Sequence, residues 1–294
     1  DFCSVDALDF KADRGKIVGL NGPNGAGKST TIKMLTGILH PTSGDISVLG
    51  LDPTKERKQL SYRIGTVFGQ KSQLWFHLPP TDSFTLLGAI YDIDKMILKK
   101  RIEELTEFFE LGDLLKTPVR KLSLGQRIRC EVAASLLHSP DILFLDEPTI
   151  GLDVVVKHKI RELILKMNRE QGTTIFLTSH DTGDIEQVCR RAVVIDHGEI
   201  ILDQPVKKLK YDYLNRKIIA VRYDVDQHME MPKGVTLEKA GKMGARLSVD
   251  THICPIDEAM RWIISHGGVA DITVEDPPME EVISTIFSHQ AVTG

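Results

Sequence analysis

Residues 22–29 read Gly22-Pro23-Asn24-Gly25-Ala26-Gly27-Lys28-Ser29, and this stretch decides the fold of the 294-residue chain. It matches the pattern G-x-x-x-x-G-K-[ST] in full. The apolar run Ile17–Leu20 precedes it, and a helical pattern follows to about Thr36, where Gly37 stops it. In such a strand–loop–helix unit, the loop N–H groups and the helix N-terminus point toward a bound phosphate. The sequence therefore predicts a phosphate-binding loop within an α/β fold.

The residue types in this loop indicate what each of them binds. Lys28 would reach the β- and γ-phosphates of a nucleotide, and the Ser29 hydroxyl would ligate Mg²⁺. We predict that the nucleotide contacts the loop and its two flanking residues, namely Asn21, Gly22, Pro23, Asn24, Gly25, Ala26, Gly27, Lys28, Ser29 and Thr30.

A second apolar run, Ile142–Leu145, ends in the acidic pair Asp146-Glu147. Asp146 would hold the magnesium shell, and Glu147 would orient and deprotonate a water that attacks the γ-phosphate. An acidic pair after a strand is, by itself, more often an exposed loop. The phosphate loop in the same chain favours the catalytic interpretation.

Four further motifs, in chain order, make the sequence resemble ABC-type ATPases. Together with the two above they cover residues 15–200. They are a Q-loop glutamine at Gln70, a signature motif at Leu122-Ser123-Leu124-Gly125-Gln126, a D-loop at Gly151–Asp153 and a switch histidine at His180. The resemblance implies a P-loop ABC ATPase cassette with a parallel sheet core, an antiparallel β subdomain and a helical subdomain.

The resemblance also implies the reaction, which is Mg²⁺-dependent ATP hydrolysis in a head-to-tail dimer. Each ATP would lie between the phosphate loop of one chain and the signature of the other, where Ser123, Gly125 and Gln126 would contact it. His180 would contact the γ-phosphate and help to fix the attacking water. Gln70 would sense Mg²⁺ and link the site to the helical subdomain, where membrane subunits dock.

Two positions depart from the family pattern. Leu124 stands where the family most often has glycine, although Ser123 and Gly125 remain. The aromatic residue on which the family stacks adenine should lie at or before position 1, and Phe2 is not assigned that role.

Strands and helices alternate along most of the chain, which predicts a largely parallel sheet with helices on its faces. Besides the two runs above, the predicted strands are Asp45–Leu49, Thr174–Thr178, Ala192–Ile195 and Glu199–Leu202, and a helix through Val156–Met167 ends at Gly172. Residues 79–138 lack strand patterns and predict the helical subdomain.

A small C-terminal α+β domain is predicted after the cassette, with domains at 1–210 and 215–294 and a boundary near 210–216. Residues 215–294 hold 8 Lys and Arg against 12 Asp and Glu. The tail predicts strands at Ile218–Tyr223, Arg246–Val249 and Asp271–Glu275, and helices at Ile256–Ile264 and Met279–Phe287.

The composition excludes several functional classes. The net charge is −4, and the acidic tail disfavours nucleic acid as a partner, because phosphates would be repelled. No apolar run approaches the ~20 residues that cross a bilayer, and we expect no signal peptide. The four cysteines show neither metal-ligand spacing nor a disulfide framework, which is typical of a reducing cytoplasm.

Three hypotheses for the function follow from the resemblance. The preferred one is an exporter ATPase on the cytoplasmic face of the cell membrane. It would be peripheral, and it would pair with a second copy of itself or a homologous cassette and with separate integral membrane subunits. The alternatives are a soluble ABC ATPase that clamps an assembly complex and an importer ATPase. Trp75-Phe76-His77 is either a docking surface for a membrane subunit or core beneath the helical subdomain.

Overall fold

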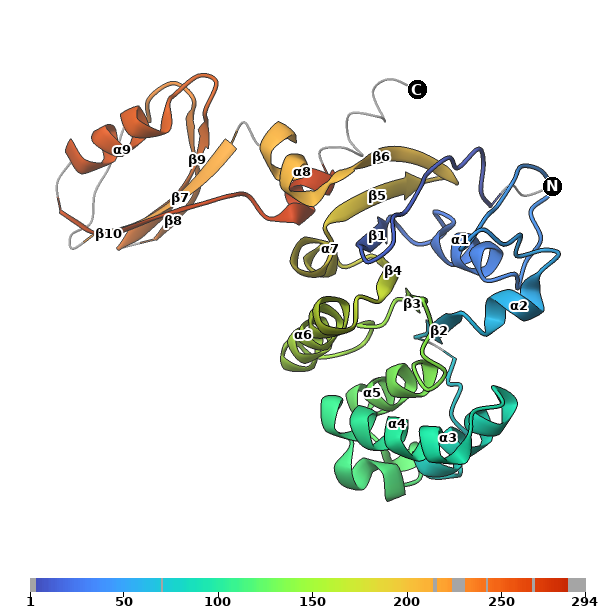
Figure 1. Ribbon diagram of the computed structural model, residues 1–294. Helices are drawn as coiled ribbons and strands as arrows, with labels where there is room; N and C mark the ends of the chain where they lie inside the picture. Colours follow the sequence, from blue (N-terminus) through green and yellow to red (C-terminus); the bar gives the residue numbers. More distant parts are fainter. Residues whose placement is uncertain are drawn as a thin grey trace. The chain divides into compact units, whose positions relative to one another are not determined.

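The computed structural model describes residues 4–69, 71–213, 216–223, 231–241, 243–265 and 268–284. The chain divides into two compact units, residues 1–204 and 205–294 (Figure 1). The boundary predicted from the sequence, near residues 210–216, lies a few residues later, within or just after helix α8 (Val206–Tyr213). No helix in these ranges is long and apolar enough to span a membrane.

The first unit is built on a six-stranded sheet whose strand order is β2-β3-β4-β1-β5-β6. In that order the strands are Ile64–Phe68, Ile142–Asp146, Thr174–Ser179, Ile17–Asn21, Arg191–Asp196 and Glu199–Pro205. Every neighbouring pair from β2 to β5 is parallel, so their carboxyl ends share one edge. The predicted parallel sheet is confirmed, and β2 is a strand that the sequence analysis did not predict.

The central strands of the sheet are apolar in sequence because they are buried. Every residue of β1 and of β4 is buried, as expected for parallel strands with both faces covered. One face carries Phe144, Phe176 and Ile195, which pack with Ile32 of α1 (Lys28–Leu35). The other main helices of this region are α2 (Arg57–Ser61), α6 (Val154–Gln171) and α7 (Thr182–Val188). Gly172 ends α6 in a left-handed conformation, as its sequence predicts.

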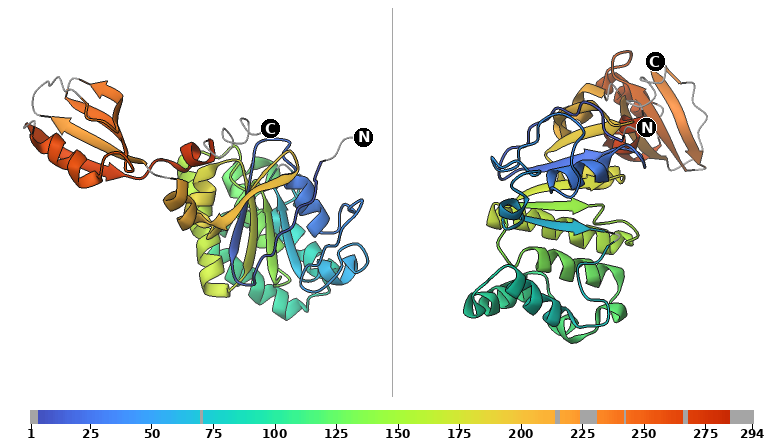
Figure 2. Two further views of the ribbon diagram at one scale, coloured as in Figure 1. Left: turned by 90° about the horizontal axis from the view of Figure 1, so that it is seen from above. Right: turned by 90° about the vertical axis from the view of Figure 1, so that its right-hand side faces the viewer.

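The predicted helical subdomain, residues 79–138, folds into helices without a strand. It contains α3 (Pro80–Ile90), α4 (Lys95–Phe108), α5 (Leu124–Ser135) and two 3₁₀ turns, η1 (Gly112–Lys116) and η2 (Val119–Lys121). The three α-helices lie together beside the β2 edge of the sheet (Figures 1 and 2). Asp94 caps α4 and Ser123 caps α5, so side-chain oxygens satisfy the first N–H groups of both helices.

The predicted strand at Asp45–Leu49 is wrong. Between α1 and α2 the structure forms one antiparallel bridge, Val48 with Leu51. Leu49 and Gly50 make the turn between them with φ values of 56° and 80°. Pairing cannot continue past Leu51, because Pro53 has no N–H to donate and Asp52 turns the chain by accepting from the Thr54 N–H.

The second unit contains a four-stranded antiparallel sheet of order β10-β7-β9-β8. The strands of this sheet and the helix that packs against it are β7 (Arg216–Tyr223), β8 (Val235–Gly241), β9 (Gly244–Asp250), α9 (Ile256–Ser265) and β10 (Val269–Glu275). Ala259 and Ile263 of α9 pack with Ile219, Leu247 and Val249 in a core of this unit's own. The predicted α+β tail has this composition, with β8 as an unpredicted strand. A further helix begins at Met279, and residues 285–287 of the predicted helix lie outside the described residues.

Candidate nucleotide-binding and catalytic site

The phosphate loop joins β1 to α1, as the sequence predicts. Gly27 has a φ of 103°, and a Cβ there would lie 2.6 Å from the carbonyl oxygen of Ser4. A Cβ at Gly22 would lie 2.3 Å from the carbonyl oxygen of Ile195. The loop therefore requires glycine at both positions because of the close approach to neighbouring backbone, and at Gly27 also because of its backbone conformation.

A cleft of about 270 Å³ opens over this loop. It is lined by Ser4, Asn24, Gly25, Gly27, Lys28, Ser29, Thr30, Glu147 and Ile150. The fold thus brings the phosphate loop and the acidic pair together from positions more than a hundred residues apart. Ser4 and Ile150 are lining residues that the sequence analysis missed, and the Ser4 hydroxyl lies 2.9 Å from that of Thr30.

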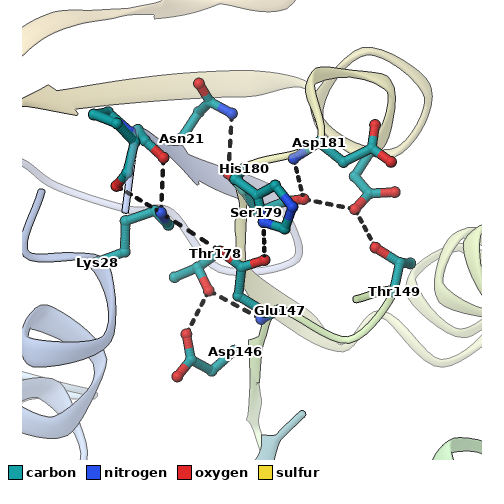
Figure 3. Close-up of polar contacts among 12 residues, drawn as sticks. Asn21, Lys28, Asp146, Glu147, Thr149, Thr178, Ser179, His180 and Asp181 are labelled. Atoms are coloured by element: carbon teal, nitrogen blue, oxygen red, sulfur yellow. Dashed lines mark hydrogen bonds and ion pairs between the residues drawn. The ribbon is translucent and has the colours of Figure 1, made fainter. Parts of the chain in front are cut away.

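Lys28 is buried beside this cleft, and its Nζ lies among oxygen atoms. It donates to the carbonyl oxygens of Gly22 at 2.7 Å and of Pro23 at 3.0 Å (Figure 3). The same Nζ lies 3.5 Å from Glu147 Oε1. The Lys28 ammonium is suited to move onto phosphate oxygens, which offer stronger charge-assisted hydrogen bonds than carbonyl oxygens.

Asp146 stands at the carboxyl end of β3 and joins the two sides of the site. Its Oδ1 accepts hydrogen bonds from the Ser29 hydroxyl at 3.1 Å and from the Thr178 hydroxyl at 2.6 Å. Carboxylate and hydroxyl oxygens fit Mg²⁺, which binds through one or two protein ligands plus phosphates and water. The described residues hold no group of three or more His, Cys, Asp and Glu side chains that could bind a metal ion.

Glu147 follows in a strained position. Its φ is 54°, which is unusual for a residue with a side chain, and its N–H donates to the carbonyl oxygen and the hydroxyl of Thr178, both at 3.1 Å. Its carboxylate lies between two cations or potential cations. Oε1 faces Lys28, while Oε2 bonds to Nδ1 of His180 at 2.5 Å (Figure 3). A water held by Glu147 and His180 would stand next to the phosphate loop.

Several predicted site residues lie elsewhere. The buried amide of Asn21 donates to the carbonyl oxygen of Ser179 at 2.9 Å and so ties β1 to β4. Ser123, Gly125 and Gln126 are not among the lining residues of the cleft. Gln70 and Phe2 lie outside the described residues.

The signature segment forms the start of α5. Ser123 Oγ accepts from the Gln126 N–H, and Gln126 Oε1 accepts from the Ser123 N–H in return. Gly125 is packed so closely that an added Cβ would lie 2.4 Å from Val156 of α6. Leu124 Cδ2 would lie 3.3 Å from an added Cβ at Gly151, so this family departure packs against the D-loop of its own chain.

Sequence comparison finds clear relatives. The ABC transporter family profile matches residues 5–150. The ABC transporter ATP-binding protein NatA of Bacillus subtilis is 35% identical over 67% of this chain and 80% of NatA. The daunorubicin/doxorubicin resistance ATP-binding protein DrrA of Streptomyces peucetius is 34% identical over 98% of this chain and 89% of DrrA. The bacitracin transport ATP-binding protein BcrA of Bacillus licheniformis is 37% identical over 70% of this chain and 66% of BcrA.

Solved structures agree with the fold. CbiO1 of Clostridium perfringens, part of the ABC transporter complex CbiONQ, aligns with a TM-score of 0.65 and 27% identity over 71% of this chain and 84% of CbiO1. A dimeric ATP-binding cassette in a post-hydrolysis state with ADP and phosphate aligns with a TM-score of 0.63 and 26% identity over 70% of this chain and 91% of the cassette.

Proposed function

The chain belongs to the ABC transporter family as an ATP-binding, ATP-hydrolysing protein, and we propose that it drives export through separate integral membrane subunits. The observation that carries the proposal is the similarity to DrrA, a drug-resistance protein, over 98% of this chain. That match extends through the C-terminal unit as well as the cassette. BcrA, named for bacitracin transport, supports the same assignment.

ATP binding follows from the geometry of the loop. We infer that the triphosphate lies over α1, where the N–H groups of the loop and the start of the helix face the anion. Lys28 would exchange its carbonyl partners Gly22 and Pro23 for β- and γ-phosphate oxygens. Ser29 and Asp146 would hold Mg²⁺, which supplies charge stabilisation at the same phosphate oxygens.

Hydrolysis would use the pair Glu147 and His180. The Glu147 carboxylate accepts a proton from the attacking water, and His180 holds the water and the γ-phosphate in line. The strained backbone at Glu147 is held by two hydrogen bonds to Thr178, so its carboxylate is placed before substrate arrives.

The proposed active unit is a head-to-tail dimer of this chain. Support comes from the separation of Ser123 and Gly125 from the cleft that holds Lys28 and Glu147. A second copy would bring its signature segment over the ATP of the first. Ser123 could then turn its hydroxyl, and the start of α5, toward the γ-phosphate.

An apolar surface between β2 and α3 suits a membrane subunit. Trp75, Phe76 and Leu78 are 41%, 52% and 43% exposed. Their backbone is fixed, because the Phe76 and Leu78 carbonyl oxygens accept from Arg120 and Val119 of η2. We propose that this surface docks the membrane subunit, which would hold the chain peripherally at the cytoplasmic face of the cell membrane.

The experiment that tests the proposal is a detergent pull-down of the tagged chain from its native membranes, with mass spectrometry of the co-purifying proteins. A polytopic membrane protein, lost when Phe76→Asp is the bait, is the expected result. Recovery of soluble partners alone, from membranes shown to be intact, would favour a clamp in an assembly complex instead.

Direction is tested with the recovered partner. Cells that express the chain and its partner are loaded with a fluorescent amphipathic drug, and its loss from the cells is followed. We expect faster efflux than in matched cells carrying Glu147→Gln. Faster uptake dependent on Glu147 would identify an importer.

A further inference from the structure

We propose that Asp184 is a positioning residue that holds Glu147 and His180 at their working separation. The inference rests on the proposed catalytic roles of those two residues. Asp184 lies in the first turn of α7 and is 1% exposed. It makes no contact with the cleft, yet it bonds to both of the segments that carry the catalytic pair.

The Asp184 carboxylate has three partners that are buried or nearly buried. Its Oδ2 accepts from the Ser179 hydroxyl at 2.7 Å and from the Thr149 hydroxyl. Its Oδ1 accepts from Arg161 Nε at 2.6 Å. Ser179 and Thr149 are both buried, so these hydroxyls depend on the carboxylate for their hydrogen bonds.

The Ser179 branch fixes the segment that carries His180. Ser179 Oγ donates to Asp184 and accepts from the Asp181 N–H at 2.9 Å. The residues on both sides of His180 are therefore held by one hydroxyl, and that hydroxyl is oriented by Asp184. Loss of the carboxylate would leave that hydroxyl free to turn and would weaken its contact with the Asp181 N–H.

The hydrogen bond from Thr149 to Asp184 fixes the chain just after Glu147. Thr149 follows Glu147 by two residues, and its carbonyl oxygen accepts from the Leu152 N–H of the D-loop at 3.2 Å. Upstream, the Glu147 N–H is already held by Thr178. The Thr149 hydroxyl supplies the second anchor, so Glu147 is bracketed between two side-chain contacts.

The guanidinium of Arg161 offsets the cost of burying the Asp184 carboxylate. It pairs with Asp184 at 2.6 Å and reaches Asp181 Oδ2 at 3.4 Å. Lys157 also pairs with Asp181. Both cations stand on α6, whose first turn Asp153 of the D-loop caps. Charge-assisted bonds are the stronger and more directional kind, which suits a group that fixes geometry.

A positioning role predicts a loss of kcat without a loss of ATP affinity. None of the residues Thr149, Ser179 and Asp184 lines the cleft where the phosphates would bind. A shift of about 1 Å in a catalytic group can cost up to about 10²-fold in rate. Binding through Lys28 and the loop would be unaffected.

The test compares full-length variants for ATP affinity, kcat and thermal unfolding. Thr149→Val removes one hydroxyl and Asp184→Asn removes the charge, and each should lower kcat about tenfold or more while KM stays within about twofold. Thr149→Ser should rescue most of the rate lost in Thr149→Val. Thr85→Val makes the same chemical change at an exposed site on α3 and controls for loss of a hydroxyl in general.

A double-mutant cycle separates positioning from general damage. In a His180→Ala background, single-turnover assays over hours should show a much smaller effect of Asp184→Asn than in the wild-type background. Equal effects in both backgrounds, or wild-type kcat in Thr149→Val and Asp184→Asn, would overturn the inference. If Glu147→Gln and His180→Ala themselves hydrolyse ATP at the wild-type rate, the proposed site fails instead.

Discussion

Glu147 is placed by a backbone conformation that few side chains adopt, and the hydrogen bonds from Thr178 make that conformation stable. Replacement by glutamine keeps the size and the strained φ but removes the base. We expect Glu147→Gln to bind ATP normally and to lose hydrolysis by about 10²- to 10⁴-fold, the usual contribution of a general base. Phosphate release in single-turnover assays, beside a direct ATP titration, measures both quantities. A variant that turns over at the normal rate would exclude Glu147 as the base.

Lys28 offers a contrasting change at the same site. Because its ammonium would exchange carbonyl oxygens for phosphate oxygens, Lys28→Ala should weaken ATP binding about 10- to 100-fold, as expected for hydrogen bonds to charged groups. Calorimetric titration of ATP measures the loss, and adenosine provides the control. A variant that binds ATP as tightly as the wild type would remove Lys28 from the binding site.

At the level of single elements, α5 carries a buried charge outside the site. Glu131 is 1% exposed, and burial raises the pKa of its carboxyl above the ordinary 4.5. The Ser72 hydroxyl and the Arg127 guanidinium, whose Nε lies 3.5 Å from Oε1, oppose that rise only in part. The carboxyl therefore stabilises the fold fully only below the unfolded pKa, and this contribution is lost as the pH rises through the folded pKa.

Glu131→Gln should for this reason stabilise the first unit at pH 7, because a neutral amide is buried at a smaller cost than a carboxylate. The gain should shrink toward zero below pH 4.5, where the wild-type carboxyl is protonated. Trp75 and Trp262 lie in different units, so urea unfolding followed by Trp75 fluorescence in a Trp262→Phe background measures the first unit. A loss of stability at pH 7 would show that the Arg127 pair outweighs burial.

The strands show where sequence patterns are enough to predict secondary structure. Buried parallel strands such as Ile142–Asp146 carry an unbroken apolar run, which sequence patterns predict almost to the residue. The strand Ile64–Phe68 escapes the pattern because Gly65 and Thr66 together interrupt its apolar residues, whereas the fold needs that glycine: a Cβ there would lie 2.5 Å from the Ser135 carbonyl oxygen. The strand Val235–Gly241 was missed because it lies at a sheet edge and most of its residues are exposed.

For the site residues too, sequence patterns predict only what local motifs contain. Lys28, Ser29, Asp146 and Glu147 belong to local motifs, so their sequence spacing predicts them. Thr178 acts through the strand register that pairs it with Asp146, and no local pattern carries that register. Asp184 meets Thr149 across 35 residues, and only the packed fold reveals that contact.

For the whole molecule, the first question is what each unit contributes. All the cleft-lining residues belong to the first unit. A truncated chain of residues 1–213, which keeps β6 and α8 intact, should therefore bind ATP within about twofold of the full-length affinity. Calorimetric titration of both forms measures this. A large loss in a truncated chain that is still folded would assign the second unit a role in binding.

The second question is whether two chains share each site. Lys28→Ala disables the phosphate loop of its own chain, and Ser123→Arg should block the signature segment that reaches the partner's ATP. Each variant alone would form only defective sites. In a mixed head-to-tail dimer, the intact loop of the Ser123→Arg chain meets the intact signature of the Lys28→Ala chain. Half of the dimers in an equal mixture are mixed, and each has one working site, so turnover should recover to about a quarter of wild type. Hydrolysis at wild-type rate by Ser123→Arg alone would mean that one chain completes its own site, and a mixture as inactive as its components would exclude the head-to-tail arrangement.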